Sequence, residues 1–414
     1  MKKLLMLIVV MALGAAVYAN GDCCPPQDPG DPCVPPPWEN YWYMPEFEEM
    51  PPCFTNFCEE DFYWEPPCSP CKFDMSKFNY ASAWQRGMGN EAKQEQVGGK
   101  HNLAIVWQRG HDNYAKQYQE GSGDDNRAII WQKGKENDAY QEQKGDDNLA
   151  LILQQGAENY AKQTQDGEDN FACIKQMSPR GYRCGGFVDI NDYAFQEQIG
   201  DDNVAIVHQF NSMEKGSDHN NKAYQYQDGD DNIAYIRQDF GYKNFAKQDQ
   251  DGDDNTAVIL QTTVHGRGGV VNPEDNEATQ IQDGDDNKAL TVQSSRDQYA
   301  KTTQIGDDNQ ATINQKRGEG NKAVVLQEGD DNFVGCMPCV ETDCCRLLMR
   351  GEITWGVFQV GCDNDVDIKQ FDDHNFAQVL QMGRDNESDV ISEGYGVVRV
   401  QQRGHDNKSW IHQH

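Results

Sequence analysis

Basic and apolar residues are both scarce in this 414-residue chain. Lys and Arg total 36 against 68 Asp and Glu, which gives a net charge of −32. A chain with so few cations lacks the basic face by which nucleic-acid-binding proteins are recognised, so we expect no nucleic-acid partner. Hydrophobic residues make up 37% of the chain, which is little for a conventional core of this length. A repeat architecture accommodates such a composition.

Long hydrophobic runs are missing after the first nineteen residues. Lys2 and Lys3 precede the apolar segment Leu4 to Ala16, and Val17-Tyr18-Ala19 resembles a cleavage site. Residues 1–19 are therefore predicted to be a signal peptide. The rest of the chain has no run approaching the ~18 apolar residues of a membrane span. We expect an exported protein, extracellular or on the cell surface, without a transmembrane segment in the mature chain.

Catalytic signatures are missing as well. The chain has no Ser–His–Asp order, no HExxH motif and no phosphate-binding glycine loop in a fitting context. Its many Asp residues recur at the same place in successive repeats. Acid–base catalysis needs instead a unique cleft with carboxylates in contrasting environments. The sequence therefore predicts a protein that is not an enzyme.

Cysteine is not scarce, and the fourteen residues are clustered. Residues 20–77 combine seven of them with prolines and aromatics. Because Pro-Pro runs exclude regular helix and central strands, we expect a loop-rich segment stapled by disulfides. Cys68-Ser-Pro-Cys71 could alternatively be half of a zinc site. Cys173 and Cys184 flank an insertion and are predicted to pair with each other. Five more lie within residues 336–362. Because the N-terminal block and this block each hold an odd number of cysteines, at least one bridge should link the two blocks or two chains.

A short unit recurs along the middle of the chain. The pattern G-x-x-N-x-A-x-x-x-Q is intact fifteen times between Gly87 and Gln327. The repeats are predicted to span residues 78–332. A Cys-rich interruption at 333–361 and degenerate repeats at 362–414 follow.

The repeat length favours strands over helices. Consecutive glutamines such as Gln132, Gln143 and Gln154 are eleven residues apart, which is also a coiled-coil period. However, Gly and Asn in every unit are turn residues, and the ~7 residues between turns are a normal strand. Alternate units are apolar, as in 128–132, or polar, as in 161–165. We therefore predict an all-β, two-sheet parallel β-solenoid of ~22-residue strand-turn-strand-turn repeats, preceded by the Cys/Pro-rich N-terminal segment.

Strand alternation predicts which side chains face the interior. If Ala points inward, so do the preceding Asn, the residue two after Ala and the closing Gln. Ile130 and Ile152 then stand in one interior column, and Gln141 and Gln163 in the opposite one. Stacked amides can bond to their own copies ~4.8 Å above and below. Such ladders satisfy buried polar groups that would otherwise be costly.

These motifs resemble a known family. The unit Q-x-G-x-x-N-x-A-x-x-x-Q, complete in residues 132–143, is similar to the curlin repeat of bacterial curli subunits. The resemblance covers residues 79–327 well and 362–413 loosely. It implies an extracellular functional-amyloid subunit that is exported by a dedicated outer-membrane pore and assembled into adhesive biofilm fibres. Curli-type secretion and nucleation machinery would be its partners.

In curlins the stacked Gln and Asn are the positions of the amyloid core. The resemblance carries this role to the following residues: Gln108, Asn113, Gln119, Asn126, Gln132, Asn137, Gln143, Asn148, Gln154, Asn159, Gln165, Asn170 and Gln176. The chain departs from typical curlins in its length, its cysteines and its insertions at 177–191, 210–220 and 262–275. These departures put unlimited polymerisation in doubt more than the fold.

Two functions therefore remain open at the level of sequence. One is a curli-like fibre subunit, or a fibre-associated nucleator or anchor. The other is a monomeric, capped β-solenoid adhesin that binds a glycan or a host or surface protein through its insertions.

The turns that leave polar strands read Gly-Asp-Asp-Asn and form an acidic stripe. Stacked carboxylates repel one another within a Debye length, and paired Asp with backbone carbonyls are suitable calcium ligands. The sequence suggests weak Ca²⁺ binding, with a merely solvated stripe that delays assembly as the alternative; no other cofactor is expected. The residues are Asp146, Asp147, Asp201, Asp202, Asp230, Asp231, Asp253 and Asp254.

The apolar strands also point hydrophobic side chains outward, at Ile129, Trp131, Leu151, Leu153, Val258, Leu260, Leu290 and Val292. An exposed strip of this size is unusual on a soluble monomer. It suggests lateral pairing of solenoids, which we favour, or coverage by the Cys-rich segments.

Overall fold

The computed structural model describes residues 79–121, 125–177, 191–211, 220–262, 264–266, 269–271, 273–335 and 356–414, which all belong to one compact unit. These segments form strands joined by turns. None of their elements is a helix that could cross a membrane. The predicted signal peptide and the Cys/Pro-rich segment, residues 1–77, lie outside the described residues.

Two large parallel sheets contain nearly all of the strands. The described strands of the first, sheet A, are β1 (Tyr80–Met88), β3 (Leu103–His111), β5 (Arg127–Lys135), β7 (Leu149–Ala157), β9 (Phe171–Met177), β11 (Val204–Phe210), β13 (Ile233–Asp239), β15 (Thr256–Gln261), β19 (Lys288–Arg296), β21 (Gln310–Glu319), β23 (Phe333–Val334), β24 (Val357–Cys362), β26 (Phe376–Arg384) and β28 (Val397–His405). Those of the second, sheet B, are β2 (Glu91–Gly98), β4 (Tyr114–Gly121), β6 (Asp138–Lys144), β8 (Tyr160–Asp166), β10 (Tyr193–Ile199), β12 (Lys222–Asp228), β14 (Phe245–Asp251), β18 (Glu277–Asp283), β20 (Tyr299–Ile305), β22 (Lys322–Glu328), β25 (Asp365–Phe371), β27 (Glu387–Glu393) and β29 (Lys408–Gln413).

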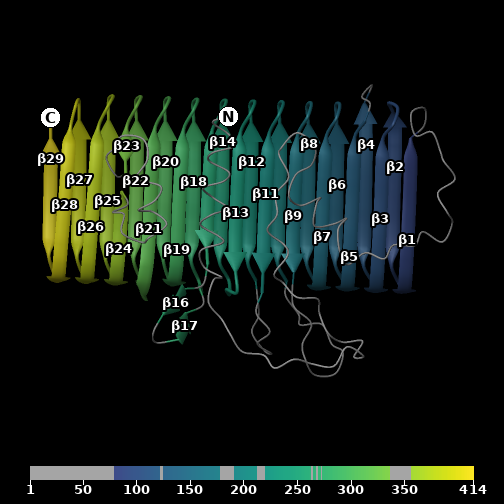
Figure 1. Ribbon diagram of the computed structural model, residues 1–414, viewed down its shortest axis with the longest axis horizontal. Helices are drawn as coiled ribbons and strands as arrows, with labels where there is room; N and C mark the ends of the chain where they lie inside the picture. Colours follow the sequence, from purple (N-terminus) through teal and green to yellow (C-terminus); the bar gives the residue numbers. More distant parts are fainter. Residues whose placement is uncertain are drawn as a thin grey trace, which may run out of the picture. The chain divides into compact units, whose positions relative to one another are not determined.

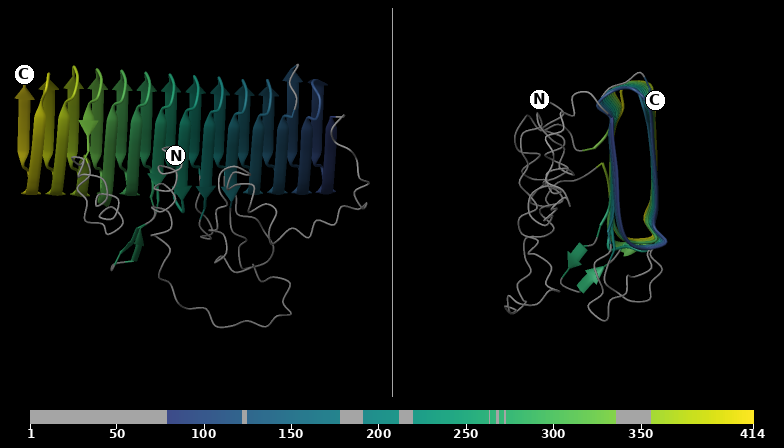
Figure 2. Two further views of the ribbon diagram at one scale, coloured as in Figure 1. Left: turned by 45° about the horizontal axis from the view of Figure 1, so that its top comes forward. Right: turned by 90° about the vertical axis from the view of Figure 1, so that its right-hand side faces the viewer.

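The chain alternates between the sheets, so that each strand pairs with the next strand but one. Equal positions stack on each other: Ala128 pairs with Ala150, and Gln132 with Gln154. The strands follow one another along the solenoid axis (Figure 1), and the two sheets face each other across a flat cross-section (Figure 2). The predicted two-sheet parallel β-solenoid is confirmed for the described residues.

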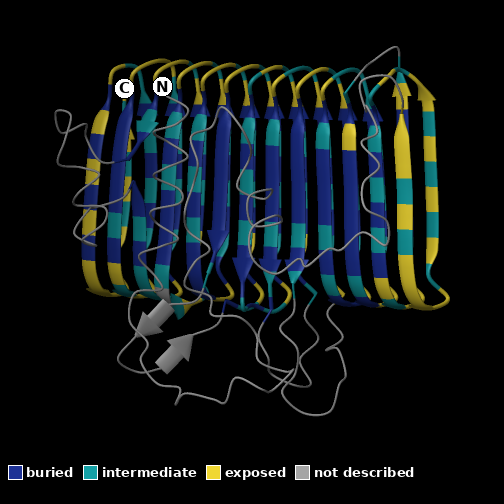
Figure 3. Ribbon diagram, turned by 45° about the vertical axis from the view of Figure 1, so that its right-hand side comes forward, coloured by how far each residue is buried: buried dark blue, intermediate teal, exposed yellow. Residues whose placement is uncertain are grey.

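The interior is filled as strand alternation predicts. On sheet A, Ile130, Ile152, Ile174 and Ile259 are fully buried in one column, and between the sheets lie small alanines such as Ala161. Because Ala adds so little volume, the two sheets can approach each other closely. Buried positions run through the middle of the stack, while strands at its ends are more exposed (Figure 3).

The interior column of sheet B changes character along the axis, a change that the repeat pattern did not predict. Gln occupies this position from Gln94 to Gln280. It is then replaced by Thr302 and, in order along the axis, by the apolar side chains of Val325, Ile368 and Val390. The buried hydrophobic residues accordingly form two clusters, one ending at Ala278 and one beginning at Ala300. The half-polar interior therefore gives way to an apolar one.

Three insertions lie on the same edge of the solenoid. They separate β9 from β10, β11 from β12, and β15 from β18, and each time the chain is passing from sheet A to sheet B. The third contains the short antiparallel hairpin of β16 (Val264–Gly266) and β17 (Gly269–Val271). The turns from sheet B to sheet A stay short, as the uniform Gly-Asp-Asp-Asn motifs predict.

The Cys-rich interruption does not break the stack. β23 pairs with the first part of β21, and β24 pairs with its later part, so together they fill one level of sheet A. In sheet B, β22 pairs directly with β25. The interruption expected at residues 333–361 therefore falls between two short strands, β23 and β24, that together take the place of one strand in sheet A. Residues 333–334 and 357–361 belong to the solenoid.

The glycines that begin the turns are required by close backbone approach. Gly252 has a φ of +112°, and a Cβ at this position would overlap the backbone carbonyl oxygen of Gly284 in the next turn. Neither the positive φ nor the contact can be relieved by side-chain rotation. The repeat thus keeps Gly because successive turns touch there.

We predict that Gly252→Ala lowers the free energy of unfolding by about 3 kcal/mol, from backbone strain together with the overlap. Gly394→Ala is the matched control, because Gly394 also has a positive φ (+72°) but a Cβ added there would have no atom within 4 Å. It should cost about 1 kcal/mol. Urea unfolding followed by circular dichroism measures both, and equal losses would contradict the role of the close approach.

Candidate functional site: amide ladders along the solenoid

A glutamine ladder runs along the interior of sheet A. The Nε2 of Gln108 donates to Oε1 of Gln132 at 2.8 Å, Gln132 donates to Gln154 at 2.9 Å, and Gln154 to Gln176 at 3.0 Å. The same polarity holds to the last described level, where Gln381 donates to Gln402. Every link points the same way because each turn repeats the backbone of the one before.

A second ladder runs along sheet B at the closing Gln of each polar strand. Gln119 donates to Gln143 at 2.8 Å, and Gln143 donates to Gln165 at 2.9 Å. The interior Gln column of the same sheet forms a third, in which Gln141 donates to Gln163. Gln141 also donates across the interior to the backbone oxygen of Ile129 on sheet A, at 3.2 Å. Side-chain amides therefore tie the two sheets together.

Many ladder amides have more than one partner. Besides Gln154, the Nε2 of Gln132 lies 2.9 Å from the backbone oxygens of Tyr114 and of Asn137. A buried polar group without partners would cost about 1–3 kcal/mol. Because the amides here are paired along and across the solenoid, the polar interior becomes a connected network rather than a penalty.

Asparagine ladders line the two edges in different ways. On the edge that carries the insertions, Asn137 Nδ2 donates to Asn113 Oδ1 at 2.8 Å and to the oxygen of Gly156 at 3.0 Å. On the other edge, Asn148 Nδ2 donates to the oxygen of Gly167 at 2.7 Å, and its backbone nitrogen donates to Asn126 Oδ1. Both arrangements bond one turn to the next.

All thirteen Gln and Asn side chains that the resemblance assigns to an amyloid core are at most 1% exposed. They lie in these ladders, at the start and the end of the strands from β3 to β9. Their part in fibre assembly stays a prediction.

The acidic stripe contains a ladder of its own, which strand alternation did not reveal. From Asp201 onward, the first Asp of the motif accepts a hydrogen bond from the backbone of the preceding turn: Asp230 Oδ1 from the nitrogen of Asp201, and Asp253 Oδ1 from that of Asp230, both at 2.8 Å. Asp201 accepts in the same way from Glu168. The signal for this ladder in the sequence was the uniform Gly-Asp-Asp-Asn motif.

The second Asp of each motif has a different task. Asp147, Asp202, Asp231 and Asp254 adopt φ values of 53–59°, in the left-handed region that Asp tolerates better than most residues. At Asp169, burial and then the neighbouring carboxylates of Asp147 and Asp202 raise the pKa. The stripe is therefore held by backbone geometry and hydrogen bonds despite its charge.

Calcium binding by this stripe stays a prediction. Ca²⁺ takes 6–8 oxygen ligands, whereas no three acidic side chains of the described stripe bring their oxygens within 4.8 Å of one another. The carboxylate of Asp230, like that of Asp253, already uses one oxygen to accept a backbone hydrogen bond.

The outward apolar strip of sheet A is largely buried within the single chain. Ile129, Trp131, Leu151, Val258 and Leu260 are less than a tenth exposed, although strand alternation points them outward. Leu153, Leu290 and Val292 are half-buried. Lateral pairing of solenoids, the alternative that the sequence favoured, stays a prediction.

Of the two cysteines in the predicted disulfide, the structure describes only Cys173. Cys173 is fully buried on β9, where it pairs with Leu151 of β7 on one side and Ile206 of β11 on the other. Cys184 lies outside the described residues. The pairing of the two stays a prediction.

One ladder position carries a buried carboxyl. Asp192 replaces the Asn of its repeat; Oδ1 accepts from the nitrogen of Asn221 at 3.1 Å, and Oδ2 accepts from Asn211 Nδ2. Complete burial raises the pKa of Asp192 to about 8, although the two asparagines oppose this. An unfolded Asp would titrate near 4. The folded chain thus holds one more proton between these values, and the stability from this group falls as pH rises through about 8.

We predict that Asp192→Asn stabilises the chain more at pH 9 than at pH 6, with a difference of at least about 1 kcal/mol in the free energy of unfolding. Asp251→Asn, at an exposed strand end, is the control and should show no such growth. Denaturant unfolding of the three chains at both pH values provides the measurement. A benefit from Asp192→Asn that does not increase with pH would contradict the assignment.

Comparison with protein families matches the curlin associated repeat to residues 145–177 and 306–335. The first segment contains β7, β8 and β9, and the second contains β21, β22 and β23. No curated protein matches the chain. The unit in both segments is the one that repeats in register along both sheets. The chain therefore contains curlin associated repeats, matched at residues 145–177 and 306–335.

Proposed function

We propose that this chain is an exported, extracellular structural protein that builds, nucleates or anchors curli-like fibres by stacking end to end. The observation that carries the proposal is the continuous glutamine ladder of sheet A, which runs from Gln85 to Gln402 and does not close on itself. A solenoid with open ends presents strand edges on which further strands can form.

Both ends of the described stack are open. In β1, the inward-facing positions Ala81, Ala83 and Gln85 are exposed, whereas Ala104 and Val106 at the same positions of β3 are buried. At the other end, the inward side chains of β29 are only half-buried. The exposed end strands are visible in Figure 3. Interior side chains at these ends therefore still have surface to bury.

The two ends match in register and in hydrogen-bond direction. β1 and β28 both have nine residues, with Gln85 and Gln402 at the sixth position and glycine at the eighth. Gln85 donates into the stack, and Gln402 accepts from within it. In head-to-tail stacking, Gln402 Nε2 of one copy would thus face Gln85 Oε1 of the next, and the ladder would continue.

Sheet B supports the same junction. Its first strand, β2, begins with Glu91, and its last strand, β29, begins with Lys408. In register, these opposite charges would meet at the interface between copies. Because the insertions lie on one edge and the interrupted level remains paired, both sheets would run through without a gap.

The same edge also supports a second function. Three excursions leave the solenoid from the sheet A to sheet B side, as expected of an adhesin whose loops bind a glycan or a surface protein. On this alternative, the purified chain would remain as single rods.

We predict that the purified full chain forms unbranched fibres under oxidising conditions at physiological salt. Gln402→Ala should slow elongation about fivefold, because each junction loses one amide hydrogen bond of about 1 kcal/mol. Gln401→Ala is the matched control, since Gln401 lies on the same strand but faces outward and is exposed. Time-resolved electron microscopy and light scattering follow both variants.

Two outcomes would overturn the proposal. Persistent single rods of the unsubstituted chain would exclude fibre formation and favour the adhesin. Fibres that elongate equally fast with Gln402→Ala and Gln401→Ala would exclude the proposed junction.

A further inference from the structure

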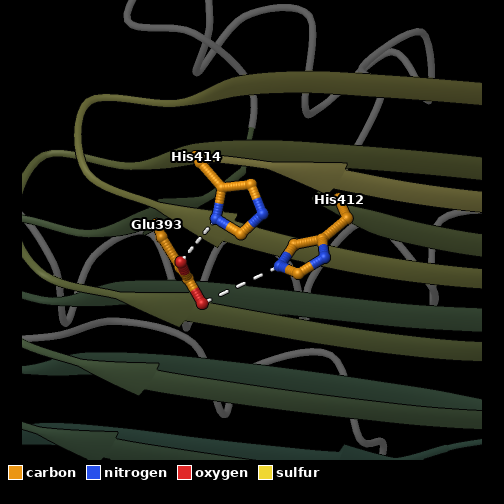
Figure 4. A group of neighbouring side chains, drawn as sticks. All are labelled: Glu393, His412 and His414. Carbon is orange, nitrogen blue, oxygen red and sulfur yellow. Dashed lines mark hydrogen bonds and ion pairs between the residues drawn. The ribbon is translucent and has the colours of Figure 1, made fainter.

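Three side chains with metal-binding groups meet at the end of sheet B. Glu393 ends β27, His412 lies on β29 and His414 follows that strand directly. Where these strands pair, Ile391 is opposite His412. Two residues further along, on the same outward face, Glu393 is therefore opposite His414. Figure 4 shows both imidazoles directed towards the carboxylate.

The spacing of these groups suits a single ion. His414 Nδ1 is 2.7 Å from Glu393 Oε2, and His412 Nε2 is 3.7 Å from Oε1. One ligand atom from each residue lies within 4.8 Å of the other two, and the imidazole centroids are 4.1 Å apart. Ligands at ~2.0–2.1 Å around a tetrahedral zinc ion are ~3.3 Å from each other. Small side-chain rotations would therefore bring all three to one ion.

The side chains are free to make those rotations. Glu393, His412 and His414 are 43%, 51% and 69% exposed, so water can reach the site and complete the coordination. Among the described residues, this is the one group of three such side chains that lies so close together. The signal in the sequence is His412-Gln-His414, because residues two apart on a strand share a face.

We propose that Glu393, His412 and His414 bind a divalent transition-metal ion such as Zn²⁺, which fastens β29 to β27. Two imidazoles and one carboxylate are a donor set for zinc, copper or nickel, whereas Ca²⁺ and Mg²⁺ prefer oxygen ligands alone. The ligands come from two adjacent strands, so the ion forms a link across the sheet. Sheet order gives β29 a single described neighbour, β27, and the link strengthens this one attachment.

Isothermal titration of the full chain with ZnCl₂ tests the binding. We expect His412→Gln and His414→Gln each to lower the affinity of this site at least about tenfold, and CaCl₂ to give no heat that depends on these residues. His405→Gln is the matched control, because His405 is an exposed histidine at the end of β28 in the other sheet. Zinc sites elsewhere in the chain would be unaffected, so the difference between variants reports this site.

Hydrogen exchange tests the link between the strands. Zn²⁺ should slow the exchange of β29 amides in the unsubstituted chain and in His405→Gln, but not in His412→Gln, His414→Gln or Glu393→Gln. Because the three ligands are exposed, these variants should retain the circular dichroism spectrum of the solenoid. Zinc affinity that is unchanged in His412→Gln and His414→Gln would overturn the site. Zinc binding without added protection of β29 would overturn the link.

Discussion

A buried side-chain amide must find partners, and this requirement governs the structure. An interior Gln such as Gln141 has two N–H donors and an acceptor oxygen in a place that water does not reach. The same residue one turn earlier and one turn later supplies an amide acceptor on one side and an amide donor on the other, both at hydrogen-bond distance. The ladder therefore needs identical residues at a fixed spacing. The repetition of the sequence is a consequence of this need.

The other repeated residues serve the same requirement. Ala161 and its equivalents keep the sheets close enough for Gln141 and its neighbours to donate across the interior. Glycine allows the backbones of successive turns to touch, so the strand spacing is maintained at the corners. From Asp201 onward, the first Asp of the acidic turn bonds to the turn before it. Charge repulsion along that part of the edge is thereby opposed by a hydrogen bond at each level.

Much of this could be predicted from the sequence, because a repeat converts one correct assignment into many. Alternation along a single strand placed Ile130 and Gln132 inside, and the period extended the result to every level. The reach of Gln141 to the backbone of sheet A could not be predicted, since it depends on the distance between the sheets. The Asp ladder, the carboxyl of Asp192 and the pairing of β23 and β24 on one level were missed for a related reason. Each depends on which residues lie side by side in space rather than in the repeat.

The family comparison and the open ends support the proposed end-to-end stacking of copies. The insertions are compatible with such stacking. A level of sheet A can accommodate an excursion from its middle, as at β23 and β24, because both halves are held by complete strands on either side. Local regularity in the chain is therefore less important than regularity along the axis. This explains how the cysteine-containing segments can interrupt the sequence without interrupting the sheets.

The change in the sheet B column, from glutamine up to Gln280 to valine and isoleucine beyond Thr302, gives the solenoid two thermal characters. Burial of apolar surface carries a large heat-capacity change and weakens on cooling, whereas burial of polar surface has a heat-capacity effect of opposite sign. The turns after Thr302 should therefore be the more sensitive to cold. The turns before it rely on amide bonds whose strength varies less over the same range. One continuous fold thus contains two stretches whose stabilities should respond to cooling to different degrees.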